Sequence, residues 1–407
     1  MTVLLDITRT VSRMSQGLVT GVDRVELAYI DEIGRRFPDA LFLTALGRDF
    51  ALISPTKFIA MKQKIAQRIL PNARGLDRLR FRLNSDQRKL RSEIRCLAIS
   101  FGKWRVLANA LHRSFPDGFE YYNTAHSNLT QQCFQQIQRG GCSNIHVFIH
   151  DMIPLDFPQY CRIDTPAVFL QKMRTAQKFA DRIIVNSNQT RSAVHHHFSK
   201  WGDVPKICVA KLGIHNADAQ SDENFGNGRP YFVVLGTIEP RKNHMVLFDV
   251  WQKFQESIPA EQMPDLFVIG RRGWGNADVF RFLDQSSQIE MNIFEKEGLP
   301  DHVVAAAVSG AHALLFPSFA EGYGLPAIEA MAQNIPTICS DLVVFRECVG
   351  DYPTYVPATD VDQWYAAIKS RLEIGKKQAK LTAIELKLID ESTWTAHFNT
   401  VFAVEFP

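Results

Sequence analysis

The sequence predicts an α/β protein built from two doubly wound, parallel-sheet domains. Its 407 residues are too many for one ordinary hydrophobic core and fit two α/β domains of similar size. Short apolar runs that suit buried strands alternate with segments of helical periodicity. Several of these runs end in polar or glycine-containing turns, and open α/β sheets bind ligands at that edge. We therefore expect ligand-facing sheet edges in both domains.

Composition and chain ends narrow the protein class. Hydrophobic residues make up 46% of the chain and charged residues 22%, which is typical of soluble globular proteins. No run approaches the 18 apolar residues of a spanning helix, and the chain starts directly in a strand without a basic leader or a cleavage site. The seven cysteines are odd in number and include no Cys-x-x-Cys pair. We expect reduced thiols in a cytoplasmic protein.

The first domain is expected to span residues 1–215. A strand at Val3–Ile7 precedes a polar stretch to Gly21 and a helix over Val22–Ile30. The later strand Ile145–Asp151 delivers His150 and Asp151 to its carboxyl end. Further strands are expected at 121–126, 182–187 and 207–210, with a helix over 169–179. Residues 216–230, rich in Asp, Asn and Gly, predict the interdomain linker.

The second domain is expected to span residues 231–390. Its strands are predicted at Tyr231–Leu235, Asp265–Gly270, Ala311–Phe316 and Pro336–Ser340. Helices are predicted around 246–254, 303–308 and 364–372, and from Pro326 onward, where the proline suits the first helical position. Residues 391–407 predict a C-terminal helix that can return to the first domain.

The loop after Ala311–Phe316 has the features of an anion site. Gly322 and Gly324 let the backbone turn tightly and approach a ligand. The following helix presents its positive end to this loop. Glu321 in the loop and Glu329, expected in the first helical turn, could both reach one polyhydroxylated ligand. By itself, Glu329 is equally well explained as a residue that favours the helix N-terminus electrostatically.

A second loop, Gly236–Asn243, strengthens this interpretation. It follows strand Tyr231–Leu235 and contains the adjacent cations Arg241 and Lys242. Arginine acts as a fork and lysine as a point charge on phosphate oxygens, so the pair suits a pyrophosphate. Both loops should open at the carboxyl edge of one parallel sheet.

Together these residues resemble a known enzyme family. Glu321 and Glu329, separated by seven residues, with Arg241-Lys242 upstream, are similar to the retaining nucleotide-sugar glycosyltransferases of the GT-B fold, the group 1 (GT4) family. The likeness is strongest over residues 231–357. It implies two Rossmann-like domains that face a cleft, a nucleotide-sugar donor, and neither a metal nor another cofactor. General likeness to bacterial polysaccharide mannosyltransferases favours GDP-mannose and a polyprenyl-diphosphate-linked saccharide acceptor.

The resemblance also implies roles for individual residues. Catalytic roles fall to His150, Arg241, Lys242 and Glu321. Donor-binding roles fall to Gly236, Arg271, Ser318, Gly322, Tyr323, Gly324, Leu325 and Glu329. The acceptor or phosphate loop corresponds to Thr20, Gly21 and Arg24, with His126 nearby, although the usual double glycine of this loop is absent.

The segment Lys57–Arg105 has an unusual charge. Fourteen Lys and Arg stand against three acidic residues, so the segment carries about +11 and the remainder about −8. Apolar residues such as Phe58, Ile69 and Phe81 are interleaved with the cations. This pattern predicts an anionic membrane surface as partner and a peripheral position on the inner face of the cell membrane. No nucleic-acid recognition module is visible, so nucleic acid is not expected as a partner.

Three other motifs favour structural roles. His195, His196 and His197 are consecutive, so on a helix they point about 100° apart and cannot share one metal ion. Asp360-Val361-Asp362 precedes a predicted helix, where N-capping is the stronger interpretation. Asn186 and Ser187 are likewise expected to cap a helix. We assign no metal site.

Two alternative functions stay open. One is a GT-B enzyme that hydrolyses or epimerises a UDP-sugar, which would not need a basic membrane segment. The other is a non-catalytic subunit that binds sugar nucleotides and assists a membrane partner; the presence of Arg241, Lys242, Glu321 and Glu329 argues against it. The donor base and sugar cannot be deduced from the residues.

Overall fold

The computed structural model describes residues 2–14, 20–67, 69–214, 225–289, 291–375 and 381–403. Its contacts divide the chain into two compact units. The first unit comprises Met1–His150, Leu170–Val185 and His195–Cys208, and the second comprises Asp151–Phe169, Asn186–Val194 and Val209–Pro407. The expected division near residue 215 misses two short segments, 151–169 and 186–194, that belong to the second unit. Most of the expected linker, residues 216–224, lies outside the described residues.

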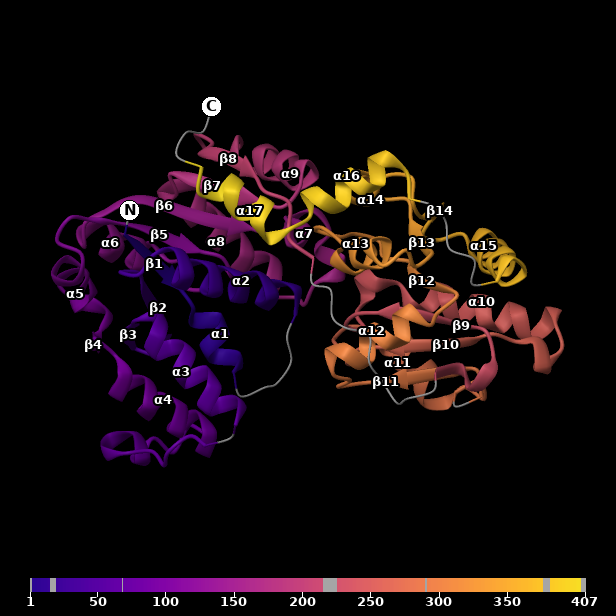
Figure 1. The fold of residues 1–407 in the computed structure, drawn as a ribbon, viewed down its shortest axis with the longest axis horizontal. Coiled ribbons are helices and arrows are strands. Elements are labelled where there is room, and N and C mark those ends of the chain that lie inside the picture. Colours follow the sequence, from indigo (N-terminus) through magenta and orange to yellow (C-terminus); the bar gives the residue numbers. More distant parts are fainter. Residues whose placement is uncertain are drawn as a thin grey trace. The chain divides into compact units, whose positions relative to one another are not determined.

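An eight-stranded sheet forms the centre of the first unit (Figure 1). Its strands are β1 (Val3–Asp6), β2 (Leu41–Leu46), β3 (Asp49–Ile53), β4 (Ser100–Lys103), β5 (Phe119–Asn123), β6 (Cys142–Ile149), β7 (Arg182–Val185) and β8 (Lys206–Val209). The spatial order is β4-β3-β2-β1-β5-β6-β7-β8. β1 pairs in parallel with both β2 and β5, whereas β3 is antiparallel to β2 and β4. The strand order reverses beside β1, and such a switch point is where doubly wound sheets bind ligands.

The helices of this part of the chain only partly match expectation. They are α1 (Thr8–Arg13), α2 (Gly21–Arg36), α3 (Pro55–Ala66), α4 (Ser85–Leu97), α5 (Leu107–Ser114), α6 (Gln131–Arg139), α7 (Ile153–Asp156), α8 (Thr165–Phe179) and α9 (Asn188–Phe198). α1 was expected to be loop. The basic segment folds into α3, the 3-10 helix η1 (Gly75–Leu79), α4 and β4. Phe58 of α3 is fully buried, so it contributes to the core and not to a surface.

The sheet of the second unit has the strand order of a dinucleotide-binding fold. Its strands are β9 (Tyr231–Leu235), β10 (Asp265–Ile269), β11 (Ile293–Lys296), β12 (Ala313–Phe316), β13 (Thr337–Ser340) and β14 (Thr354–Val356). All pairs are parallel, in the order β11-β10-β9-β12-β13-β14. The order reverses between β9 and β12, so the loops that follow these two strands share the switch point.

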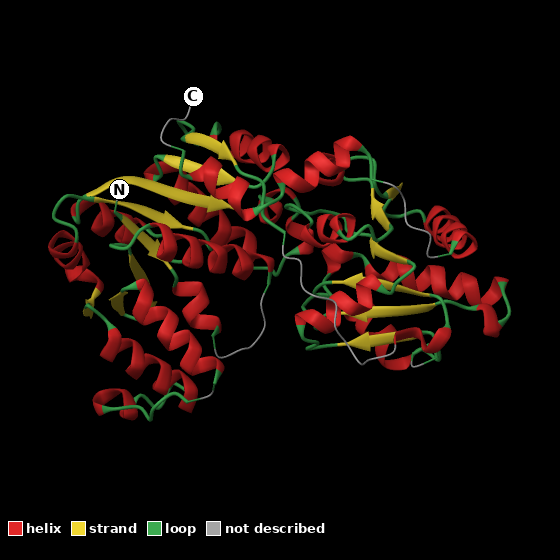
Figure 2. Ribbon diagram, in the orientation of Figure 1, coloured by secondary structure: helices red, strands yellow, loops and turns green. Residues whose placement is uncertain are grey.

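Two hydrophobic cores cover the two faces of this sheet, and Figure 2 shows the surrounding helices. Phe232 and Val234 pack on one face, while the alternating Tyr231 and Val233 pack on the other. The first core includes residues of α10 (His244–Ser257), α11 (Ala277–Gln285) and α15 (Val361–Ile374). The second includes residues of α12 (Asp301–Ser309) and α13 (Leu325–Ala332). The sheet is therefore doubly wound, as predicted.

The C-terminal region contains two helices, the second of which lies within the predicted range 391–407. α16 (Ala383–Glu391) begins with a capping box of Thr382 and Glu385, and α17 (Trp394–Val401) is capped by Thr393. His397 of α17 bonds through Nδ1 to the carbonyl oxygen of Lys211 at 2.9 Å. Both residues belong to the second unit, so α17 is grouped there and not with the first domain. Across the described residues, no helix combines the length and apolarity needed to cross a membrane.

Candidate active site

Two loops meet at the switch point of the second sheet. The backbone N–H of Phe319, after β12, donates to the carbonyl oxygen of Arg241, after β9, at 2.8 Å. Nδ2 of Asn243 donates to the carbonyl oxygen of Pro317 at 3.1 Å. These bonds hold the two loops together. Because β9 and β12 pair in parallel, the loops that follow their carboxyl ends already lie side by side.

The charged side chains of both loops form one cluster. Nζ of Lys242 lies 2.6 Å from Oε1 of Glu321, and Nη1 of Arg241 lies 2.8 Å from the same oxygen. A second carboxylate, Glu239, accepts from Nη2 of Arg241 at 2.8 Å. The structure therefore brings together three of the four predicted catalytic residues. Glu239 was missed, because its position two residues before Arg241 resembles an ordinary loop residue.

The cluster keeps its carboxylate ionised. Burial alone would raise the pKa of Glu321, but the charges of Arg241 and Lys242 outweigh it and hold that pKa at about 2. Burial lowers the pKa of Lys242, although the neighbouring Glu321 opposes this shift. Arg241, Lys242 and Glu321 thus form a preassembled, charged group whose donors face the switch point. Such donors can stabilise an anion without first having to reorganise.

The start of α13 adds backbone amides to this group. Gly324 caps the helix at φ +88°, and a Cβ there would lie 2.5 Å from Cε1 of Phe345, so the position requires glycine. Leu325 and Pro326 open the first turn, in which Pro326 has no N–H and the N–H of Ala327 donates to the carbonyl oxygen of Gly324 at 2.9 Å. Ser318 is buried next to Glu321, and its side chain helps to lower the pKa of that carboxyl. Gly322, Gly324 and Leu325 thus occupy the predicted anion-binding loop.

Two predicted donor-binding residues are placed differently from expectation. Tyr323 is buried, and its hydroxyl donates to the carbonyl oxygen of Leu212 at 3.4 Å. Glu329 is half-buried on α13, but it is the fifth residue of that helix. It therefore lies in the second turn and not in the first.

The turn after β10 packs against the loop Gly236–Asn243. The backbone carbonyl oxygen of Arg271 in this turn accepts the N–H of Ile238 at 2.9 Å. Gly270 packs so closely that a Cβ would lie 1.9 Å from the carbonyl oxygen of Gly236. The side chain of Lys242 in turn packs on Gly236, where an added Cβ would lie 3.3 Å from its Cε. These contacts fix the direction in which Lys242 points.

The segment 151–169 contributes a carboxyl that the sequence did not predict at this site. Oδ1 of Asp151 accepts from the N–H of Ile153 at 3.0 Å, so this carboxyl braces the loop that follows β6. It also lines a cavity of about 70 Å³ together with Glu321, Phe319 and Thr190. Burial raises the pKa of Asp151, although the nearby Arg241 opposes this. The sequence did not predict that Asp151 lies near Glu321, because this depends on residues 151–169 belonging to the second unit.

The fourth predicted catalytic residue, His150, belongs to the first unit. Its Nε2 lies 2.7 Å from the carbonyl oxygen of Thr124, so Nε2 carries the hydrogen. Nε2 of His126 lies 2.9 Å from the carbonyl oxygen of Phe148, and the two rings meet edge to face. Burial lowers the pKa of His150 to about 4 and that of His126 to about 3. Both imidazoles are therefore neutral at physiological pH.

The predicted acceptor loop of the first unit is partly a helix cap. Thr20 and Asp23 form a capping box at the start of α2, and Oγ1 of Thr20 also accepts from Nη2 of Arg9 at 3.3 Å. Gly21 is the first residue of α2, and the N–H of Arg24 bonds to the carbonyl oxygen of Thr20. The cap explains Thr20 without a ligand.

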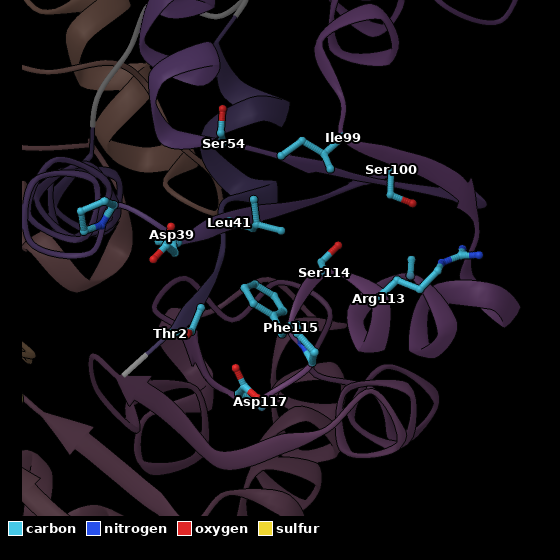
Figure 3. A pocket seen from close by; sticks show the side chains of 15 residues that line it. Thr2, Asp39, Leu41, Ser54, Ile99, Ser100, Arg113, Ser114, Phe115 and Asp117 are labelled. Atoms are coloured by element: carbon cyan, nitrogen blue, oxygen red, sulfur yellow. The ribbon is translucent and has the colours of Figure 1, made fainter.

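A larger cavity of about 740 Å³ lies at the opposite edge of the first sheet (Figure 3). It is lined by residues that precede β1, β2 and β5, among them Thr2, Asp39 and Asp117. Its lining includes two carboxylates and one arginine, Arg113, so it lacks the excess of cations that a diphosphate would need. None of the predicted site residues lines it.

Two of the motifs interpreted as structural, those of Asp360 and Ser187, act as helix caps. His195 and His196 are exposed on α9, and His196 contacts Lys200. Oδ1 of Asp360 accepts from the N–H of Gln363 at 2.9 Å as the N-cap of α15, and Oγ of Ser187 accepts from the N–H of Thr190 at 3.1 Å. Within the described residues, no group of three or more His, Cys, Asp or Glu side chains is placed to hold a metal ion.

The family of the chain follows from a match to its second unit. Residues 216–385 match the family model described as "Glycosyl transferases group 1". The match covers less than half of the chain and lies within the second unit. The matched region contains both loops of the charged cluster, so Arg241, Lys242 and Glu321 lie in the part of the chain that the family shares. The predicted family is thereby confirmed.

Two curated relatives are mannosyltransferases by name. The serotype-specific mannosyltransferase WbdA of Escherichia coli is 26% identical over 241 residues, which are 54% of this chain and 29% of WbdA. The O-antigen chain mannosyltransferase RfbU of Salmonella typhimurium is 26% identical over 230 residues, 56% of this chain and 60% of RfbU. The chain thus spans less than a third of WbdA's length.

Solved structures confirm the fold. Anabaena HepE in complex with UDP and glucose has a TM-score of 0.57 at 16% identity, with 98% of this chain and 95% of that chain covered. An α,α-trehalose-phosphate synthase (UDP-forming) from Burkholderia xenovorans, in complex with glucose-6-phosphate, has a TM-score of 0.56 at 13% identity, with 73% and 76% covered. The chain has the GT-B architecture of two α/β units, in which the sheet of the first unit is mixed because β3 is antiparallel to its neighbours.

Proposed function

We propose that the chain is a retaining glycosyltransferase that moves a sugar from a nucleoside-diphosphate sugar to a saccharide acceptor. The observation that carries this proposal is the cluster in which Arg241 and Lys242 share Glu321 at the switch point of the second sheet. GDP-mannose is the favoured donor, because the curated relatives are named mannosyltransferases. A polyprenyl-diphosphate-linked saccharide of surface polysaccharide synthesis is the favoured acceptor, because RfbU is named for the O-antigen chain.

In the proposed mechanism, the cluster stabilises the leaving group. Breaking the anomeric bond places negative charge on the departing diphosphate and positive charge on the sugar. Arg241, Lys242 and the N-terminus of α13 supply preorganised donors for that charge. Glu321 and the amides of Gly322–Leu325 hold sugar hydroxyls, Glu329 binds the ribose, and His150 contacts the donor sugar. The departing phosphate helps to deprotonate the acceptor hydroxyl. Neither a metal ion nor another cofactor is required.

A panel of donors tests this proposal. GDP-mannose and several UDP-sugars are incubated with the full chain, with and without a lipid-linked saccharide acceptor, and the released nucleoside diphosphate is measured. We expect release from GDP-mannose that depends on the acceptor. Release from a UDP-sugar without acceptor would instead support a hydrolase or epimerase. Binding without any release would support a non-catalytic subunit.

We further propose that the chain works on the cytoplasmic face of an anionic membrane, through the segment Lys57–Arg105. Phe81 is 82% exposed between Arg80 and Arg82, and Ile69 is 59% exposed. Other cations of the segment serve the fold: Arg91 is buried and pairs with Asp49 and Asp77, which also pair with Arg80. Arg78, Arg82 and Arg88 have no ion pair with a described residue, and these remain for the membrane. Arg68 lies outside the described residues.

A further inference from the structure

A short segment after β6 carries aromatic side chains that no role proposed so far uses. Residues 151–169 follow the first sheet in the sequence, yet they belong to the second unit. The N–H of Phe157, at the end of α7, donates to the carbonyl oxygen of Ile153 at 2.8 Å. The N–H of Tyr160 donates in turn to the carbonyl oxygen of Phe157 at 3.1 Å and closes the 3-10 helix η3 (Pro158–Tyr160). Two consecutive hydrogen-bonded turns therefore fix the backbone at Tyr160.

The rings of this segment stack on the loop that follows β12. The ring of Tyr160 lies nearly parallel to the ring of Phe319, with centroids 5.2 Å apart and an angle of 5° between the planes. The ring of Phe157 stacks on Tyr160 at 6.2 Å and 24°. Offset stacks at these separations attract each other beyond the area that they bury. The hydroxyl of Tyr160 makes no hydrogen bond with a described residue, so its contribution at this site comes from the ring.

Phe319 is bonded directly into the charged cluster. Its N–H donates to the carbonyl oxygen of Arg241 at 2.8 Å. The carbonyl oxygen of the next residue, Ala320, accepts from Nη1 of Arg241 at 2.7 Å, and Oε1 of Glu321 lies 2.8 Å from the same nitrogen. Three consecutive residues of this loop thus contact one arginine. A shift of Phe319 therefore displaces two acceptors that Arg241 binds, one of them the carboxylate shared with Lys242.

The same segment is anchored at a second loop of this sheet edge. Cζ of Arg162 lies 5.0 Å from the ring centroid of Trp274, in the turn after β10. A guanidinium group over an indole ring makes an attractive cation–π contact. Because β9 lies between β10 and β12 in the sheet, the two anchored loops flank the loop Gly236–Asn243. Tyr160 and Arg162 thus tie the segment to both neighbours of that loop.

Two rings of the stack also line the space beside Glu321. The cavity of about 70 Å³ at this site is lined by Phe157 and Asp151 of the segment and by Phe319 and Glu321 of the loop. Withdrawal of either ring would widen this space and admit water. Water weakens the attraction between Glu321 and its two cations, because the interaction of charges falls as the dielectric constant rises. The stack therefore favours the assembled cluster in two ways, by holding the loop and by limiting access of water.

We propose that Tyr160 is a positioning residue for the proposed transfer reaction. Its ring holds Phe319 by stacking, and Phe319 keeps the backbone before Glu321 in place. The inference rests on the proposed function, in which the cluster of Glu321 with Arg241 stabilises the departing diphosphate. Donors that are already in place stabilise a developing charge without reorganising. Loss of the Tyr160 ring should therefore lower kcat and leave the KM for the donor nearly unchanged.

Hydrogen exchange tests the positioning without any transfer reaction. In the full chain, exchange of the peptide 317–325 is measured by mass spectrometry in Tyr160→Ala, Tyr160→Phe and Ile163→Ala. Tyr160→Ala removes the ring, so amides of this peptide should exchange about fivefold faster or more. Tyr160→Phe keeps the ring and should exchange like the unmodified chain. Ile163→Ala is the matched control, because Ile163 belongs to the same segment and is 96% exposed.

A second peptide separates a local effect from a loss of the fold. The peptide 231–235 is strand β9 in the core of the second unit, and its exchange should be the same in all variants. If Tyr160→Ala also raises exchange there, Tyr160→Leu takes its place, since leucine keeps an apolar side chain but cannot stack.

Initial rates then measure the effect on the reaction. With a donor that the panel identifies, kcat should fall about tenfold in Tyr160→Ala, with KM within about twofold, and Tyr160→Phe should retain both values. Exchange of 317–325 that is unchanged in Tyr160→Ala, or kcat that falls equally in Tyr160→Ala and Tyr160→Phe, overturns the proposal. Faster exchange in Tyr160→Ala, together with no turnover of any donor by the unmodified chain, would reject only the proposed function.

Discussion

Nζ of Lys242 lies 2.6 Å from Oε1 of Glu321, although 79 positions separate the two residues in the sequence. The same oxygen lies 2.8 Å from Nη1 of Arg241. One carboxylate thus positions both cations, and the cations in turn keep its pKa at about 2. Removing any one of the three should disturb the other two, so their effects on catalysis should not be additive.

The two glutamates of the α13 region should differ in what they control. Glu321→Gln keeps the shape of the side chain but removes the charge that orients Arg241 and Lys242, so we expect turnover to fall on the order of 10- to 100-fold. Glu329→Gln, on α13 itself, should mainly weaken binding of nucleoside diphosphate. Steady-state kinetics and calorimetry on both variants separate these effects. The assignment is wrong if nucleoside diphosphate binds both variants as tightly as it binds the unmodified chain.

Gly324→Ala should destabilise the second unit more than a positive φ alone explains. Gly298 has a similar φ of +73° but open space around it, whereas a Cβ at Gly324 meets the ring of Phe345. Gly298→Ala should therefore cost about 1–2 kcal/mol, and Gly324→Ala a further 1–3 kcal/mol for the steric conflict. Thermal unfolding midpoints of the two variants provide the comparison. Equal midpoints would mean that Phe345 moves aside freely.

His244 should make the second unit acid-sensitive. Its ring is buried, both ring nitrogens lack a hydrogen bond to a described residue, and burial lowers its pKa to about 3. The unfolded chain takes up a proton near pH 6.5 while the folded chain does not, so stability is full above pH 6.5 and falls as the pH drops towards 3. From pH 7 to pH 5 this one residue should cost about 2 kcal/mol.

The variant His244→Gln isolates that contribution. Its denaturant midpoint should fall less between pH 7 and pH 5 than that of the unmodified chain. An identical pH dependence in His244→Gln and the unmodified chain would show that the His244 ring takes up its proton in the folded state.

Vesicle flotation tests the membrane proposal. The chain should float with anionic but not neutral vesicles and detach at high salt, because each engaged cation contributes roughly 1 kcal/mol and is screened by ions. The triple variant Arg78→Glu/Arg82→Glu/Arg88→Glu should abolish flotation. Arg80 is spared, since it pairs with Asp49 and Asp77.

The matched control for flotation reverses three exposed cations of the first unit outside the segment. Arg48→Glu/Arg113→Glu/Arg139→Glu changes the net charge by the same amount and should still float. Equal loss of flotation in the two triple variants would show that only net charge matters. Flotation that ignores lipid charge would contradict the proposal directly.

Local sequence patterns predicted most strands and the two loops of the second unit. Tyr231–Leu235 and the run before Phe316 are continuous apolar segments, and the parallel sheet then forces their carboxyl ends together. The contact of Arg241 and Lys242 with Glu321 could therefore be predicted from the sequence. α1 was missed because its six residues are mostly polar and too few to show a helical period.

Long-range pairing accounts for the remaining failures. The charge of the basic segment was counted correctly, yet nothing local reveals that Asp49, outside the segment, pairs with Arg91 inside the fold. Asp151 follows a strand of the first sheet but belongs to the second unit, so its position near Glu321 depends on how the chain crosses between units.

The most direct test of the account is the initial rate of sugar transfer at subsaturating donor in Arg241→Ala and Lys242→Ala. Each substitution removes a charged contact to the developing diphosphate, so kcat/KM should fall by about 2–4 kcal/mol of transition-state stabilisation, roughly 30- to 1000-fold, with thermal stability retained. Lys253→Ala, an exposed cation of α10 that pairs with Asp362, should keep the full rate. Near-normal rates in both Arg241→Ala and Lys242→Ala would contradict the claim that this cluster holds the donor diphosphate.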